Sequence, residues 1–311
     1  MLSSMLRYGV ALPVLVSAAV LLISWPLWRR TKLPQKGAWA VALALGLGCA
    51  AGQIGVEGAR SFPPREAADR LFYLTLAAVA LDVLDFQRFC PSWLRGALRA
   101  VLWLVVVWSL LPPALRTEAS RGVPASWLVG LGLAGLVFWF ALALTARRLP
   151  GTTMLLLFLV SAGTIGVLSR GHSVTLTQLA GVLTAALLPI LIRSACGPPV
   201  ILATAPVMVL LPGLWLRSHF YDYEPPPMPA FLLLAAATVT GTLGLLPGIR
   251  SLAPWRRCLL CAAAASLLAT AAVLLARDAS AVEKPEELLQ MDSEKSIANS
   301  GRLLLAIRLD S

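Results

Sequence analysis

Charged residues are scarce in this chain. They make up 13% of its 311 residues, whereas hydrophobic residues make up 58%. In soluble proteins roughly 25% of residues are charged. The apolar runs also follow one another so closely that no loop between Arg29 and Arg277 has room for a folded soluble domain. The composition therefore excludes a soluble protein and favours one embedded in lipid.

Sequence motifs that carry chemistry are lacking as well. The chain has no glycine-rich phosphate loop, no nucleophile elbow and no His-Glu-x-x-His motif. Its two histidines are too few for haem ligands paired across helices. No soluble basic patch with stacking aromatics is present that would bind nucleic acid. We therefore assign no catalytic residue, metal site or cofactor, and we expect no nucleic-acid partner.

Cysteine is also rare. The chain has 5 cysteines, an odd number, and most lie in or beside apolar runs, which argues against a disulfide framework. Cys258 and Cys261 have the C-x-x-C spacing, but a zinc site needs about four ligands. Two small residues that pack at the start of a helix are the simpler interpretation.

Apolar segments are what the chain has in abundance. Each is long enough to cross about 30 Å of hydrocarbon, so the sequence predicts an all-α, polytopic integral membrane protein. We expect one transmembrane domain over residues 1–277 and a polar, acidic tail over residues 278–311 that is disordered or lies at the membrane surface. The ten predicted helices cover residues 8–28, 37–56, 71–90, 98–115, 123–146, 151–169, 174–192, 200–216, 230–249 and 258–276.

The distribution of charge predicts the orientation. The net charge is +11, and the tail from Asp278 holds four Lys or Arg against seven Asp or Glu, so the preceding part carries +14. Short loops after the odd-numbered helices hold the larger share of Lys and Arg, and such loops stay in the cytoplasm. We expect a bacterial inner (plasma) membrane protein with both termini outside the cytoplasm. The basic loops would contact anionic lipid head groups.

Small residues and prolines predict special helix packing. Residues 48–52, Gly-Cys-Ala-Ala-Gly, have the spacing that lets two helix backbones approach closely. Five prolines between Pro189 and Pro212 predict bent or interrupted helices, because proline removes a backbone donor.

Tryptophan is concentrated near the predicted helix ends, as in the aromatic belt of a membrane protein. The residues in question include Trp25, Trp28, Trp39, Trp93, Trp127, Trp215 and Trp255.

The segment 71–90 holds the foremost candidate site. Asp82 and Asp85 are three residues apart, so they share a helix face, and Arg88 lies near the same face. If the helix spans 71–90, Asp82 lies near the membrane midplane, where ionisable residues mark ion or substrate paths.

A second placement of this helix along the sequence gives the same residues a structural role. If the helix begins near Ala67, both carboxylates lie at the cytoplasmic interface. Arg88, Arg95 and Arg99 would neutralise them there. The sequence leaves both registers open.

Two other polar residues belong with these candidates. Gln178 adds polarity to the predicted helix 174–192, and we include it with Asp82, Asp85 and Arg88 in a predicted substrate or ion path. His219 lies in the predicted loop 217–229 and is a candidate for a ligand mouth or metal site, although an ordinary interfacial loop is the simpler interpretation.

Three functions fit these observations. The first is a permease for a small or lipophilic solute, with the Asp82 helix and the two proline-rich helices lining its path. The second is a non-catalytic membrane subunit or scaffold that binds partner membrane proteins. The third is a lipid-modifying enzyme, but two carboxylates with no other acid nearby make a poor magnesium site. If Asp82 and Asp85 face lipid head groups or pair with Arg95 and Arg99, with no cavity between the helices, the permease hypothesis fails. If they line a cavity with the two proline-rich helices, the scaffold hypothesis weakens.

Overall fold

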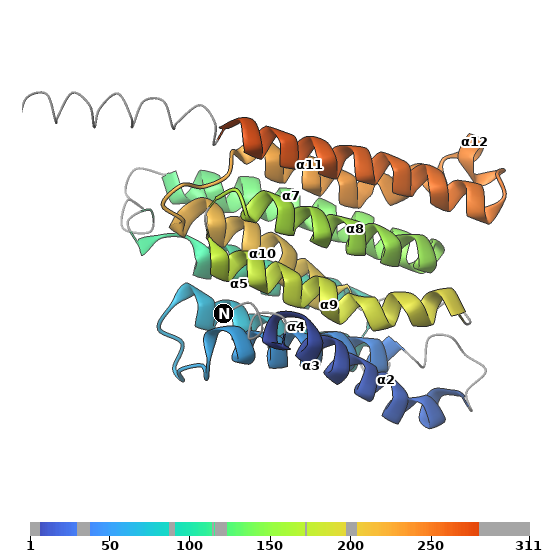
Figure 1. Cartoon of the computed structure of the whole chain (residues 1–311), viewed down its shortest axis with the longest axis horizontal. Coiled ribbons are helices and arrows are strands. Elements are labelled where there is room, and N and C mark those ends of the chain that lie inside the picture. The colour runs from blue at the N-terminus through green and yellow to red at the C-terminus, as the bar shows by residue number, and fades with distance from the viewer. Residues whose placement is uncertain are drawn as a thin grey trace, which may run out of the picture.

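The chain folds into a bundle of helices that run along one common direction (Figure 1). The computed structural model describes residues 7–29, 38–86, 91–113, 115, 123–171, 173–196 and 204–279. No strand occurs within these ranges, which confirms the predicted all-α class. In chain order the helices are η1 (Arg7–Ala11), α2 (Leu12–Arg29), α3 (Ala38–Glu57), α4 (Ala67–Phe86), α5 (Ser92–Leu110), α7 (Val123–Arg148), α8 (Pro150–Leu168), α9 (Val174–Cys196), α10 (Ala205–Tyr221), α11 (Met228–Val239), η4 (Thr240–Leu245), α12 (Pro247–Arg250) and a final helix, Pro254–Ala279.

Within the described ranges, 8 helical stretches have the length and apolar composition to cross a membrane. The protein is therefore a polytopic membrane protein with about eight spans, and the prediction of ten was too high. The two helices that fall short are α4 and α10. α4 carries four charged residues, Asp69, Arg70, Asp82 and Asp85, and α10 has 17 residues.

α10 lies in the interior of the bundle. Every residue from 205 to 216 is buried, and the helix packs against α4, α5 and α9. Because protein rather than lipid surrounds it, α10 needs neither the length nor the lipid-facing surface of an ordinary span.

The small-residue run in α3 permits the close helix packing that the sequence predicts. A Cβ atom on Gly48 would collide with the Ser17 hydroxyl of α2, and one on Gly52 would come within 2.5 Å of Val182 in α9. The Ser17 hydroxyl also donates a hydrogen bond to the Ala44 carbonyl at 2.8 Å. α2, α3 and α9 therefore form a close-packed group.

Two of the five prolines lie inside continuous helices. Pro189 lies within α9 and Pro212 within α10, and each helix continues on both sides of its proline. Pro198 and Pro199 lie outside the described residues. A change of helix type occurs elsewhere, where α11 passes into the 3-10 helix η4.

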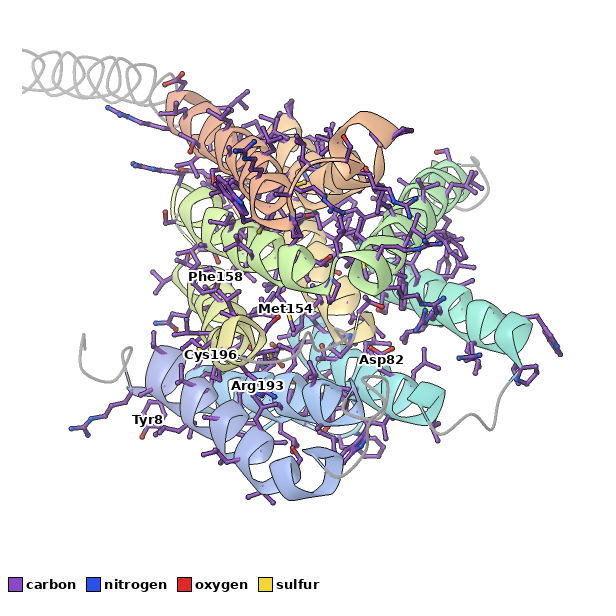
Figure 2. The ribbon with its side chains drawn as sticks, turned by 90° about the vertical axis from the view of Figure 1, so that its right-hand side faces the viewer. Tyr8, Asp82, Met154, Phe158, Arg193 and Cys196 are labelled. Carbon is purple, nitrogen blue, oxygen red and sulfur yellow. The ribbon has the colours of Figure 1, made fainter. Side chains whose placement is uncertain are left out.

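The two ends of the bundle differ in charge. The start of α2 and the end of the final helix lie at the same end of the bundle (Figure 1). We call it the mixed-charge end, because seven described arginines and six Asp or Glu residues lie there. The opposite, basic end faces the viewer in Figure 2. There nine described arginines accompany only Asp82 and Asp85; they are Arg29, Arg95, Arg99, Arg147, Arg148, Arg193, Arg250, Arg256 and Arg257.

Candidate functional site

Asp82 is a buried carboxylate at the basic end of α4. Its side chain is 1% exposed, and Oδ1 accepts a hydrogen bond from Arg99 Nη2 in α5 at 3.3 Å. Oδ2 accepts a hydrogen bond from the backbone N–H of Ala205, the first residue of α10, at 2.8 Å. A charge pair and a helix N-terminus both stabilise the ionised carboxylate, which would otherwise be costly to bury.

Two further residues complete this group. Thr204 precedes α10 but makes no side-chain cap to it; its hydroxyl accepts a hydrogen bond from Trp139 Nε1 of α7 at 3.3 Å. The guanidinium carbon of Arg99 lies 5.8 Å from the centroid of the Trp139 ring, within cation–π range. These residues, which we call the Asp82 cluster, join α4, α5, α7 and α10.

The register of α4 is the second of the two considered from the sequence. The helix begins at Ala67, four residues before the start of the predicted segment 71–90, so that prediction was wrong. Asp69 explains the earlier start, because its Oδ2 accepts the backbone N–H groups of Arg65 at 3.3 Å and Glu66 at 3.4 Å and so anchors the first turn. In this register Asp82 pairs with Arg99 of α5.

The other predicted path residues do not join the cluster within the described part of the chain. Asp85 lies in α4, but its side chain is outside the described residues, as is the whole of Arg88. Gln178 lies in the second turn of α9, at the mixed-charge end and thus opposite Asp82.

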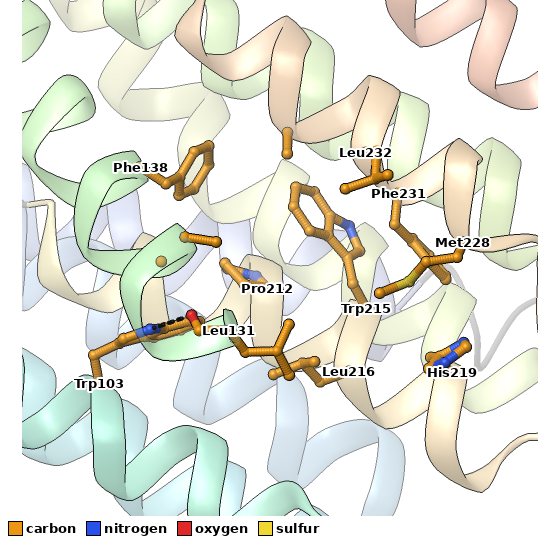
Figure 3. Close-up of a pocket in the computed structure, with 13 residues that line it drawn as sticks. Trp103, Leu131, Phe138, Pro212, Trp215, Leu216, His219, Met228, Phe231 and Leu232 are labelled. Atoms are coloured by element: carbon orange, nitrogen blue, oxygen red, sulfur yellow. Dashed lines mark hydrogen bonds between the residues drawn. The ribbon is translucent and has the colours of Figure 1, made fainter. Parts of the chain in front are cut away.

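An apolar pocket of about 140 Å³ lies beside α10 (Figure 3). Two of its lining residues are exposed, Ala134 of α7 and Leu232 of α11, the latter at 61%. α7 and α11 both belong to stretches that are long and apolar enough to cross a membrane, and we call the exposed side of the pocket between Ala134 and Leu232 its mouth. The lining residues are Trp103 of α5; Leu131, Ala134, Gly135 and Phe138 of α7; Pro212, Trp215, Leu216 and His219 of α10; and Met228, Phe231, Leu232 and Ala235 of α11.

Aromatic rings form much of the wall. Trp215 stacks on Phe231 with ring centroids 6.3 Å apart, and Phe138 lies 6.4 Å from Trp215 in a tilted arrangement. Trp215 is 7% exposed, so it belongs to the pocket wall and its assignment to an interfacial belt was wrong.

The indole N–H groups of the wall are already engaged. Trp103 donates to the Leu131 carbonyl at 3.1 Å, and Trp215 donates to the Thr164 hydroxyl at 3.2 Å. Both tryptophans therefore present their apolar rings to the pocket.

His219 is the one ionisable residue among those that line the pocket. The predicted loop began too early, because α10 continues through Tyr221 and carries His219 in its last turn. Figure 3 shows His219 and Met228 at one end of the pocket, with Trp103 and Phe138 at the other.

The pocket and the Asp82 cluster share three helices. Arg99 and Trp103 are four residues apart on α5, and Gly135 and Trp139 are four apart on α7, so each pair lies on one helix face. On α10, Pro212 lies seven residues beyond the first residue, about 10 Å along the axis. The cluster therefore lies beyond the pocket in the direction of the basic end.

A second ionic network lies at the mixed-charge end. Arg60 pairs with Glu57 and, at 3.6 Å, with Asp69, while Arg217 pairs with Glu57 at 3.2 Å. Burial lowers the pKa of Arg60, and the Asp69 charge opposes that shift. Because two arginines face two carboxylates here, the network is balanced and ties α3, α4 and α10 together.

Potential metal ligands and Cys261 are the remaining features of the described ranges. No group of three or more His, Cys, Asp or Glu there is placed to hold a metal ion. Cys261 is buried, and its backbone carbonyl accepts a hydrogen bond from the Thr240 hydroxyl at 3.4 Å. This contact agrees with a packing role for the start of the final helix.

The chain matches no protein-family model, no curated protein and no solved structure. Its function is therefore argued from its own residues.

Proposed function

We propose that this protein is a permease for a small lipophilic solute, which binds in the pocket between α5, α7, α10 and α11. The observation that supports the proposal is a pocket with aromatic walls. Its exposed lining residues belong to two helices that could cross a membrane, so its mouth would face lipid. Small-molecule sites are typically concave and mostly apolar, with few polar groups that fix orientation.

The path would run from the lipid-facing mouth to the basic end. In that direction the pocket is followed by the Asp82 cluster, in which Asp82 pairs with Arg99 and holds the N-terminus of α10. We assign this pair the role of closing the path at the basic end. Asp82 remains a path residue in this proposal, but it closes the path and does not bind the solute.

The charge asymmetry supports an orientation. The basic end would face the cytoplasm and the mixed-charge end the outside of a bacterial inner membrane, because arginine-rich ends remain on the cytoplasmic side. The arginines of the basic end would then lie against anionic head groups.

Two leucines provide a matched test of the permease. Leu232 lines the mouth and is 61% exposed, whereas Leu133 of α7 is also 61% exposed but does not line the pocket. Leu232→Trp would fill the mouth, while Leu133→Trp would add the same bulk on a lipid-facing surface.

The readout is the distribution of small apolar metabolites between cells and medium. Cells that lack the protein should differ from wild type in at least one such compound. Wild type and Leu133→Trp should restore its distribution, and Leu232→Trp should not. If no compound changes, or if Leu232→Trp restores the distribution fully, the proposed function is wrong.

A further inference from the structure

The volume of the pocket limits the size of its ligand. It is about 140 Å³, close to an engineered apolar cavity of about 150 Å³ that stays dry and binds benzene. A single six-membered ring therefore fills the pocket. A fused ring system or a long acyl chain would extend out through the mouth.

The walls favour a ring that is aromatic. Trp215 and Phe231 stack, and Phe138 and Trp103 lie across the pocket from His219 (Figure 3). Aromatic rings pair through offset-stacked and edge-to-face contacts, and each such pair adds to the gain from burial. A flat aromatic ring can make several of these contacts at once.

Only three side chains in the lining of the pocket carry a nitrogen or oxygen atom. The two indole N–H groups donate to Leu131 and Thr164. His219 is the only other lining residue whose side chain carries a nitrogen or oxygen atom. An imidazole has two ring nitrogens, each of which can donate or accept a hydrogen bond, so His219 is the lining side chain that can bond the polar group of a ligand.

His219 also lies toward the membrane surface, where the polar group of such a ligand would be located. It is two residues from the end of α10, at the mixed-charge end, whereas Trp103 lies near the middle of α5. Small aromatics with one polar group orient at a membrane surface with the ring inward and the polar group toward water. Such a molecule reaches the mouth in the orientation that places its polar group at His219.

From these observations we infer that the solute is a monocyclic aromatic molecule with one hydrogen-bonding substituent, of which a phenol is the simplest form, and that His219 recognises the substituent. The inference rests on the proposed function and names the class of its solute.

The test compares 4-fluorophenol with 4-fluorotoluene, which differ by a hydroxyl in place of a methyl group. Binding of each to the full chain in lipid nanodiscs is measured by ligand ¹⁹F NMR, and empty nanodiscs give the partition blank. Wild type should bind both probes saturably. It should prefer the phenol by about 3- to 10-fold after correction for partition, the gain from one hydrogen bond.

Variants of His219 distinguish hydrogen bonding to the hydroxyl group of the phenol from the fit of its ring in the pocket. His219→Leu should lower the phenol affinity to that of the toluene and leave the toluene affinity unchanged. His219→Gln, which keeps hydrogen-bonding groups, should retain part of the preference. Leu232→Trp should abolish binding of both probes, whereas Leu133→Trp should not.

The outcomes also separate this inference from the permease. Equal affinity for the two probes in wild type, or a preference that survives in His219→Leu, would overturn the assignment of His219. Absence of saturable binding by either probe would overturn the solute class, while a metabolite distribution that still depends on Leu232 would leave the permease standing. Probe binding as expected with no metabolite effect would retain the binding site and overturn transport.

Discussion

At the scale of single residues, Asp82 links α4 to two other helices through one side chain. It accepts hydrogen bonds from Arg99 and from the N–H of Ala205, and Arg99 in turn lies over the Trp139 ring. The partners of a buried ion offset the free-energy cost of removing it from water. If a partner is removed, that cost is no longer offset and the folded state is destabilised.

This dependence predicts a non-additive pair of substitutions. Arg99→Leu should destabilise the protein by about 3 kcal/mol, because it leaves the Asp82 charge buried without its pair. In Asp82→Asn/Arg99→Leu the loss should be smaller than the sum of the two single losses, since no unpaired charge remains. Denaturant unfolding in detergent measures all four members of the cycle, and additive losses would show that the pair is not coupled.

Only part of the Asp82 cluster could be predicted from the sequence. Asp82 stands out as a carboxylate in an apolar run, and the register that begins at Ala67 brings arginines of the next helix to it. Ala205 lies 123 residues away in the chain, and Thr204 is reached by Trp139 from 65 residues away. Contacts of this separation depend on how the helices pack, which local spacing does not specify.

At the scale of helices, the wall of the pocket depends on the close approach of α5 and α7. A Cβ atom on Gly135 of α7 would collide with the indole ring of Trp103, whereas one on Gly130 of the same helix meets nothing within 4 Å. Gly135 therefore lets the indole of Trp103 approach α7 closely and donate to the Leu131 carbonyl.

These two glycines predict opposite effects of the same substitution. Gly135→Ala should destabilise the protein by about 1–3 kcal/mol, because the added methyl group overpacks the contact with Trp103. Gly130→Ala should be neutral or stabilise by up to about 1 kcal/mol, since alanine is the better helix former. Thermal unfolding in detergent compares the two. Equal effects would mean that α5 and α7 do not meet at Gly135.

The helices were easier to predict than the pocket between them. Long apolar runs specify a helix from local composition alone, and the described helices occur where such runs lie. One signal of the pocket was present, because Pro212, Trp215, Leu216 and His219 recur with helical spacing on one face of α10. That pattern is also typical of ordinary core packing, and the pocket depends on the shapes of four helices together.

At the scale of the whole molecule, charge distinguishes the two ends of the bundle, and two of its helices depart from the composition or length of an ordinary span. α4 keeps four charged residues, and α10 remains short because protein encloses it. The hydropathy of a sequence shows how long its apolar segments are, but not whether lipid or protein surrounds each segment. The sequence therefore predicted ten membrane spans, whereas about eight helices have the length and composition of a span.

The orientation can be tested with thiols at opposite ends. Cys196 is exposed at the basic end, and Tyr223 is 98% exposed at the mixed-charge end. In variants that keep one cysteine each, a membrane-impermeant maleimide added to intact spheroplasts should label Tyr223→Cys and spare Cys196. The reverse pattern would invert the proposed topology.

We propose that the pocket beside α10 takes up a small apolar molecule from lipid. Saturable binding of 4-fluorotoluene tests this most directly, because that probe needs the apolar walls and not His219. We expect saturable binding to wild type and Leu133→Trp in nanodiscs, and only partition into lipid with Leu232→Trp. Equal binding to Leu232→Trp and wild type would contradict the account, since the probe would then bind elsewhere on the protein.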